Sequence, residues 1–190
     1  MRIAILIVLA IIASIYAARQ EGDSTPPGRA AWARLIAYWV FTIPVAYELT
    51  SGALWELLGI KFIRVTMAHL GYPPYIGYIQ GVPRIPFVPA LLLPRFPRLK
   101  EWAYAWTFFT YAGVAASQFL VGDGPGRWVP TLVFSSVTLV SWALRPPSRR
   151  LGNPAPMARP SAIAWSVPLM VTAAMLAVAY ISLPTGGPPH

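Results

Sequence analysis

Six continuous apolar stretches, separated by short breaks rich in arginine, proline or glycine, occupy almost all of this 190-residue chain. Charged residues make up only 11% of the sequence, whereas a soluble domain carries roughly 25%. So little charge cannot cover a water-facing surface, so the pattern predicts a protein that lies mostly in a lipid bilayer. Lipid offers the backbone no hydrogen-bond partners and the apolar runs do not alternate, so we expect an all-α, polytopic membrane helical bundle rather than a barrel.

The charge balance is basic, with 15 Lys and Arg against 6 Asp and Glu and a formal net charge of +9. These cations lie mainly in the breaks between apolar stretches, which is the positive-inside pattern of membrane proteins. We therefore expect the lipid bilayer as the partner and no nucleic acid. The sequence has no cysteine, and one of its two histidines is the last residue. Thiolate metal sites, disulfides and paired-histidine haem ligation are thereby excluded, and no metal or cofactor is expected.

The N-terminal stretch, Ile3–Ala18, is short for a membrane span, which needs about 20 residues. Ile15 and Tyr16 occupy the positions where signal-peptide cleavage requires small residues. We expect residues 1–20 to form a retained membrane anchor helix, with a signal peptide as the alternative. Residues 21–33 form a polar linker, and its two adjacent prolines exclude a continuous helix.

The next four apolar stretches form one predicted core, residues 34–150, and a sixth stretch in residues 161–183 adds a C-terminal transmembrane helix. The four core stretches are residues 34–54, 75–93, 101–121 and 128–144. Between the first two, residues 55–72 are less apolar and are expected to lie as an amphipathic segment at the membrane surface. Pro83, Pro86 and Pro89 lie three residues apart, so the span over 75–93 is expected to be kinked or broken.

Counting cations on the two sides of six spans gives the predicted orientation. Ten lie on the side of the 21–33 linker and four on the other side. The ten are Arg19, Arg29, Arg34, Arg95, Arg98, Lys100, Arg145, Arg149, Arg150 and Arg159; the four are Arg2, Lys61, Arg64 and Arg127. The richer side is expected to be cytoplasmic, with both termini outside, in the bacterial inner membrane.

Two ionisable groups fall inside predicted spans, Glu48 and Arg84. Such groups are costly in lipid and are candidate functional residues. Their depths below the outer end differ by roughly 5 Å at 1.5 Å per residue, so the sequence predicts that they form an ion pair. The pair either ties two helices together or lines a polar cavity in which a lipid headgroup or substrate binds.

Further polar residues are expected near the outer ends of the spans, at similar height. They are Ser51, Glu56, His69, Tyr72, Ser117, Gln118 and Asp123. His69 is either a proton-transfer group or an interfacial anchor, and Gln118 is either a cavity residue or a hydrogen-bonding group between helices. Together with Glu48 and Arg84, the residues His69, Gln118 and Tyr72 make up the candidate polar cavity.

A second candidate site lies at the predicted inner face, around Glu101 and Tyr104. Glu101 is expected in the first turn of its helix, where an acid complements the helix dipole, and to neutralise Arg95 or Arg98. The nearby aromatic residues are typical both of an interfacial aromatic belt and of the walls of quinone sites.

The ordered set Leu70-Gly71-Tyr72-Pro73, Leu91-Leu92-Leu93-Pro94, Lys100-Glu101-Trp102-Ala103-Tyr104-Ala105, Ala115-Ala116-Ser117 and Leu144-Arg145-Pro146 resembles the DoxX-like family of small bacterial membrane proteins. The resemblance implies a four-helix membrane core, with the first and last stretches as additions. The family often has Ser-His where this chain has Ser117-Gln118, so the resemblance implies no proton-transfer histidine at that position.

Three functions are compatible with these observations. The first is an accessory subunit that binds a quinone or lipid-like ligand in a membrane redox system, carries no electrons itself and contacts a redox protein. The second is an intramembrane isomerase that uses Glu48, His69 or Glu101 as acid and base. The third is a small-molecule transporter, for which a broken span containing Arg84 is the only indication.

Overall fold

The computed structural model describes residues 2–19, 28–152 and 161–184, and all regular structure within them is helical. The helices are α1 (Arg2–Arg19), α2 (Arg29–Leu58), α3 (Lys61–His69), α4 (Ile76–Leu92), α5 (Pro97–Leu120), α6 (Pro125–Leu144), a short 3-10 turn (Pro147–Arg149) and α7 (Ala162–Ile181). The expectation of an all-α protein is therefore confirmed.

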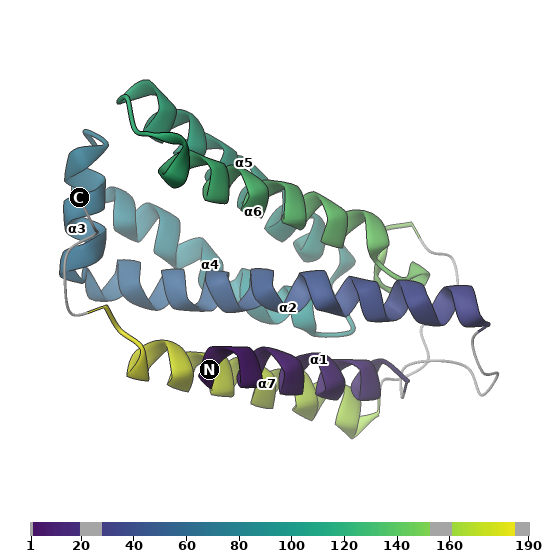
Figure 1. Cartoon of the computed structure of the whole chain (residues 1–190). Coiled ribbons are helices and arrows are strands. Elements are labelled where there is room, and N and C mark those ends of the chain that lie inside the picture. Colours follow the sequence, from purple (N-terminus) through teal and green to yellow (C-terminus); the bar gives the residue numbers. More distant parts are fainter. Residues whose placement is uncertain (1, 20–27, 153–160, 185–190) are drawn as a thin grey trace.

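The long helices run roughly along one axis in three layers of two, as Figure 1 shows: α5 and α6, then α2 and α4, then α1 and α7. Successive long helices run in opposite directions, so their ends gather at two opposite ends of the bundle. Helix α2 is central and contacts α1, α4, α6 and α7. Its fully buried Tyr38, Trp39, Ile43 and Leu49 form the middle of the apolar core.

Two of the described helices, α2 and α7, are long and apolar enough to cross a membrane, and α1 contains the shorter apolar run Ile3–Ala18. Many large apolar side chains of the outer layers are exposed. Examples are Leu9, Ile12, Phe109, Phe119, Leu132, Val133, Leu169 and Met170.

Helix α2 extends about one turn beyond each end of the predicted 34–54 stretch, so residues 29–33 are helical and do not belong to the linker, and Gly59 is its C-cap. Gly59 adopts the left-handed conformation, with φ 56°, and its N–H donates to the Glu56 carbonyl at 3.1 Å. The segment predicted over 55–72 is thus divided, because only its later part forms the separate helix α3. Figure 1 shows α3 lying across the end of α2 rather than continuing it. The extra turn places Glu56 inside α2, close to the start of α4.

Helix α4 continues through Pro83, Pro86 and Pro89, so of the two alternatives expected for this span, kinked or broken, the broken one is wrong. Its end is stabilised by two buried cations from other parts of the chain. The Lys100 ammonium donates to the carbonyls of Ala90, Leu91 and Leu93, and Arg149 donates to the Leu92 carbonyl at 3.0 Å. Cations at a helix C-terminus complement the dipole and supply donors to carbonyls that have no intrahelical partner.

Candidate functional site

Helix α2 carries a polar stripe at intervals of four residues, Glu48, Gly52 and Glu56, and residues four apart lie on the same face of a helix. Gly52 faces the Arg84 side chain of α4. A Cβ atom built there would lie 1.6 Å from Nη1 of Arg84, so only glycine leaves room for the guanidinium. Arg84 therefore lies against α2 between two carboxylates.

Arg84 pairs with Glu56, whose Oε1 lies 3.0 Å from Nη2, and both side chains are only 4% exposed. The guanidinium also lies over the Trp106 ring, 5.4 Å from its centroid. Oε2 of Glu56 and Nε of Arg84 are buried and make no hydrogen bond within the described residues. A buried ion pair with unsatisfied atoms is costly, and such atoms are commonly satisfied by a ligand or water.

The predicted pairing of Arg84 with Glu48 is wrong. Glu48 instead accepts a hydrogen bond from the Tyr111 hydroxyl of α5 at 3.2 Å. Helical side chains point toward the N-terminus of their helix, and the N-terminus of α4 lies at the Glu56 end of α2. A span that ended near Leu54 would leave Glu56 outside it, but α2 continues to Leu58. Gly59 was the signal in the sequence that α2 extends further.

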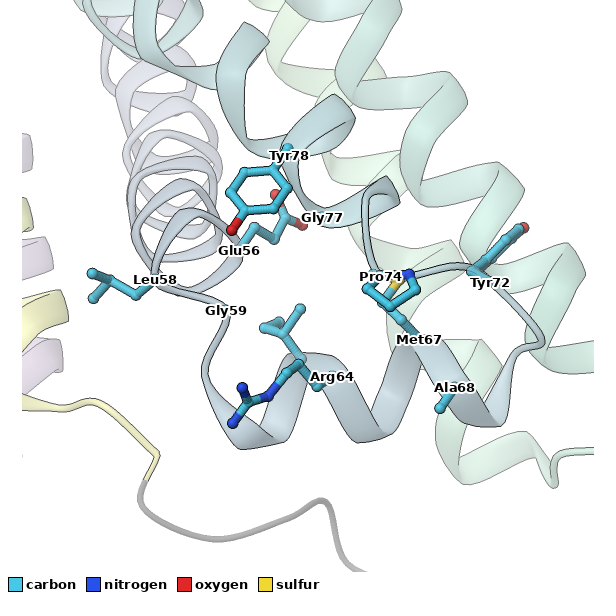
Figure 2. Close-up of a pocket in the computed structure, with 11 residues that line it drawn as sticks. Glu56, Leu58, Gly59, Arg64, Met67, Ala68, Tyr72, Pro74, Gly77 and Tyr78 are labelled. Atoms are coloured by element: carbon cyan, nitrogen blue, oxygen red, sulfur yellow. The ribbon is translucent and has the colours of Figure 1, made fainter.

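A cavity of about 280 Å³ lies beside Glu56, between the end of α2, helix α3 and the start of α4. Figure 2 shows Glu56 and Tyr78 on the wall formed by α2 and α4, and Met67 and Ala68 on the wall formed by α3. The lining residues are Glu56, Leu58, Gly59, Ile63, Arg64, Met67, Ala68, Tyr72, Pro74, Gly77 and Tyr78. The lining is mainly apolar and carries two charged side chains, Glu56 and Arg64, so the cavity is suited to a largely apolar ligand with a polar, hydrogen-bonding end.

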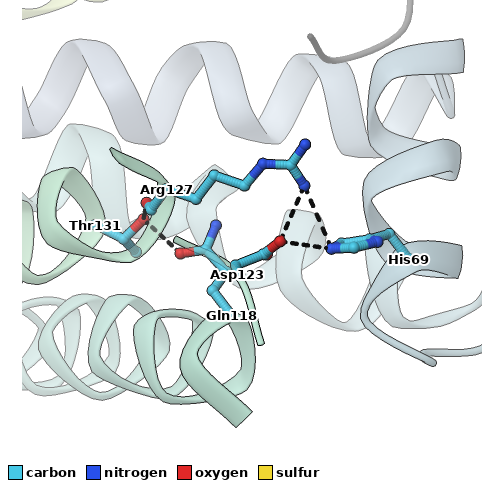
Figure 3. A network of polar contacts seen from close by, with 5 residues as sticks. All are labelled: His69, Gln118, Asp123, Arg127 and Thr131. Carbon is cyan, nitrogen blue, oxygen red and sulfur yellow. Dashed lines mark hydrogen bonds and ion pairs between the residues drawn. The ribbon is translucent and has the colours of Figure 1, made fainter. Parts of the chain in front are cut away.

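Two of the candidate residues, His69 and Gln118, lie outside this cavity in a separate polar cluster (Figure 3). His69 Nε2 lies 2.9 Å from Asp123 Oδ1, which also lies 3.1 Å from Arg127 Nη1. Gln118 accepts a hydrogen bond from Thr131 at 3.0 Å and so links α5 to α6. This cluster fixes the end of α3 to the turn between α5 and α6.

Tyr72 lines the cavity, and its hydroxyl lies 2.6 Å from the Ser117 hydroxyl of α5. Of the five residues proposed for the polar cavity, only Tyr72 lines it, and Arg84 reaches it through Glu56. Glu56 is the central residue of the site, and the sequence interpretation named it only among the outer polar groups.

The inner-face candidates Glu101 and Tyr104 both line a groove of about 460 Å³ between α5 and α6. Glu101 does not lie in the first turn, because α5 begins at Pro97, and it pairs with neither expected arginine. Its carboxylate instead lies 2.8 Å from Arg145 Nη2 and accepts a hydrogen bond from the Trp142 indole at 2.8 Å. The reason is topological, because α6 ends beside the start of α5 and this places Arg145 next to Glu101.

Tyr104 connects this groove to the interior of the bundle. Its hydroxyl lies 2.9 Å from that of Ser141, which lies 2.7 Å from that of Thr42 on α2. All three side chains are buried, so they form a hydrogen-bonded link between α2, α5 and α6. Such links stabilise helix association where water is excluded.

Metal binding was not expected from the sequence. Within the described ranges, no group of three or more His, Cys, Asp and Glu side chains is arranged to hold a metal ion.

Comparison with known proteins gives one match. The model of the DoxX-like family matches residues 40–141, which run from the middle of α2 almost to the end of α6. The matched region includes Glu48, Glu56, Arg84, Glu101 and the cavity beside α3. No curated protein and no solved structure matches the chain.

Proposed function

This chain belongs to the DoxX-like family, and from that premise we propose that it is a multi-pass protein of the bacterial inner membrane. In this proposal α1, α2, α4, α5, α6 and α7 cross the bilayer and α3 lies at its surface. Three observations support it: alternating helix directions, exposed apolar side chains on the outer layers, and basic residues gathered at one end. The basic end faces the cytoplasm in this arrangement.

The function that the geometry supports best is binding of a quinone or a similar isoprenoid-type lipid in the cavity beside α3. The observation that carries the proposal is the buried Glu56–Arg84 pair, whose Glu56 Oε2 has no hydrogen bond in the described part of the chain, next to an apolar cavity. An unsatisfied carboxylate oxygen accepts a hydrogen bond from the hydroxyl of a quinol, the reduced form of a quinone, or of an isoprenoid alcohol, and the apolar walls accommodate the adjoining hydrocarbon.

The protein itself carries no electrons in this proposal. Its sequence has no cysteine, and no haem ligand pair is available in it. Its role is therefore that of an accessory, ligand-holding subunit of a membrane redox system, with a redox protein as the partner that reacts with the bound molecule.

The test is native mass spectrometry of the full chain extracted gently from its own membranes, combined with lipid extraction of the same sample. We expect one bound quinone or isoprenoid per chain in the wild type and its loss in Glu56→Leu. Glu48→Gln is the matched control, because Glu48 lies on the same stripe of α2 but does not line the cavity. A wild-type protein that carries only bulk phospholipid would contradict the proposal.

A second candidate function is an intramembrane isomerase with Glu56 as the acid–base group. The same unsatisfied carboxylate oxygen favours it, because a carboxylate beside a bound lipid can take up a proton and return it to another carbon. The two functions differ in the fate of the ligand. Incubation of the wild type with the extracted lipid in deuterated water leaves the lipid unlabelled if the protein only binds it, and introduces deuterium if Glu56 exchanges a proton with it.

A further inference from the structure

The groove between α5 and α6 lies at the opposite end of α5 from the α3 cavity and is not needed for the proposed function. Its walls are almost entirely apolar and are formed mainly by Trp102, Ala105 and Phe109 of α5 and by Leu139 and Trp142 of α6. The three α5 residues recur at intervals of three to four residues, so they form one stripe along the helix. Trp102 and Phe109 are 68% and 70% exposed, which leaves this stripe accessible from the side of the bundle.

Glu101 lines the end of the groove toward the start of α5, and its counter-charge, Arg145, lies buried behind that end. Arg145 is only 3% exposed, lies 5.0 Å from the Tyr104 ring and 5.3 Å from the Trp142 ring, and pairs with Glu101. Both rings line the groove. Nη1 of Arg145 is buried and has no hydrogen bond within the described residues. The guanidinium thus retains a donor close to the wall of the groove after its pairing with Glu101.

The first turn of α5 adds two further features that favour an anion. Its N-cap residue, Phe96, provides no side-chain cap, and the first turn contains no acid. Arg98 lies in that turn, four residues before Trp102 on the same stripe, and is exposed. An uncapped helix N-terminus with its free N–H groups attracts anions, and arginine binds phosphate through two parallel hydrogen bonds.

The net charge at the end of the bundle where α5 starts also favours an anion. Among the residues that the structure describes there, Glu101 is the one acid, against nine cations. These are Arg19, Arg29, Arg34, Arg95, Arg98, Lys100, Arg145, Arg149 and Arg150. Arg34, Arg149 and Arg150 donate to neutral helix carbonyls. A carbonyl does not neutralise a cation, so these charges contribute to the positive potential near the proposed membrane surface.

We propose that this groove binds a lipid whose head group carries a phosphate. The hydrocarbon chain lies along the stripe of Trp102, Ala105 and Phe109. The phosphate lies at Arg98 and the start of α5, within the field of Arg145. The inference rests on the proposed membrane placement, since only a protein in a bilayer presents this groove to lipid. It is otherwise independent of the Glu56 cavity.

The test measures lipid binding to the full chain in mild detergent by native mass spectrometry. Phosphatidylglycerol is compared with phosphatidylcholine of the same acyl chains, and a polyprenyl monophosphate is added as a competitor. Arg98→Gln removes the exposed cation, with Arg29→Gln as the control that removes the same charge at the same end. Ala105→Trp fills the groove, with Ala116→Trp as the control on an exposed part of α5 that does not line it.

We expect phosphatidylglycerol to bind more tightly than phosphatidylcholine, and Arg98→Gln to weaken this binding about five-fold, the effect of one basic residue near a phosphate. Ala105→Trp should abolish the preference, while the two controls and Glu56→Gln leave it unchanged. Displacement by the polyprenyl phosphate identifies an isoprenoid source of the phosphate, and no displacement identifies a diacyl lipid.

Equal binding of the two phospholipids would overturn the proposal. It would also be overturned if Arg98→Gln weakened binding and Ala105→Trp did not, because the phosphate would then be attracted by surface charge without use of the groove. Loss of the quinone in Glu56→Leu, measured on the same samples, reports on the proposed function separately.

Discussion

At the scale of single residues, the site depends on a glycine that makes room for the cation paired with Glu56. Gly52 lets the Arg84 guanidinium lie directly on α2, and Glu56 neutralises it there. Removing water from two charges costs several kcal/mol each, and their attraction offsets this only when the geometry is good. The pair is therefore sensitive to any change that leaves one charge without the other.

Arg84→Leu should lower the free energy of unfolding by about 3–5 kcal/mol, because it leaves Glu56 buried without a counter-charge. The double variant Glu56→Leu/Arg84→Leu should be more stable than Arg84→Leu alone. Thermal melts in detergent measure both. Pairing of Glu48→Leu with Arg84→Leu is the control and should give little rescue. If the losses of unfolding free energy in Glu56→Leu and Arg84→Leu simply add in the double variant, the assigned ion pair would be contradicted.

Gly52→Ala should displace the Arg84 guanidinium, since the added Cβ would lie 1.6 Å from Nη1. We expect a loss of about 1–3 kcal/mol, the usual cost of overpacking, together with a loss of the bound quinone. Gly113→Ala is the matched control, because a Cβ there meets nothing within 4 Å. Equal melting temperatures for the two variants would show that Arg84 does not depend on Gly52.

At the scale of elements, the ends of helices decide where the cavity lies. Gly59 ends α2 in the left-handed conformation and turns the chain into α3, which forms one wall of the cavity. Gly59→Ala should cost roughly 1–2 kcal/mol, the penalty of this conformation for a residue with a Cβ. Gly28→Ala, at a φ of −58°, is the control. Chemical denaturation monitored by tryptophan fluorescence measures the difference, and equal midpoints would contradict the assigned cap.

Helix α3 is held at its end by the cluster of His69, Asp123 and Arg127 (Figure 3). Asp123→Asn removes the charge that both other residues contact. Partly exposed pairs contribute about 0.2–1 kcal/mol, so the amides at the end of α3 should exchange with deuterium about two- to five-fold faster. Glu101→Gln, at the other end of the bundle, should leave α3 unchanged. Unchanged exchange in Asp123→Asn would show that apolar contacts alone hold α3.

At the scale of the whole molecule, three layers of antiparallel helices place the Glu56 cavity and the α5–α6 groove at opposite ends. If the long helices cross the bilayer, the start and the end of α5 face different compartments. The natural sequence has no cysteine, so single cysteines report position without a background. Pro97→Cys should be labelled by a membrane-impermeant reagent only from the cytoplasmic side, and Gly124→Cys only from outside. Reversed labelling would overturn the orientation.

The sequence by itself determined the helical architecture, the long helices and the family. Continuous apolar runs leave the backbone few alternatives to helix, and Gly59, Pro97 and Pro125 mark helix ends through fixed local preferences. It also identified Arg84 and Glu101 as ionisable residues that need partners. A charged residue within or beside an apolar stretch can be recognised from the sequence, and burying its charge without a partner is costly.

Only the tertiary structure decided which partners they have. Glu56 rather than Glu48 meets Arg84, and Arg145 rather than Arg95 or Arg98 meets Glu101, although each is many residues away in sequence. Such contacts depend on helix rotation and on the direction of a side chain along its helix, which sequence spacing does not specify. The continuity of α4 through three prolines was decided in the same way, because packing against α2 and α5 keeps the segment helical where the prolines remove hydrogen bonds.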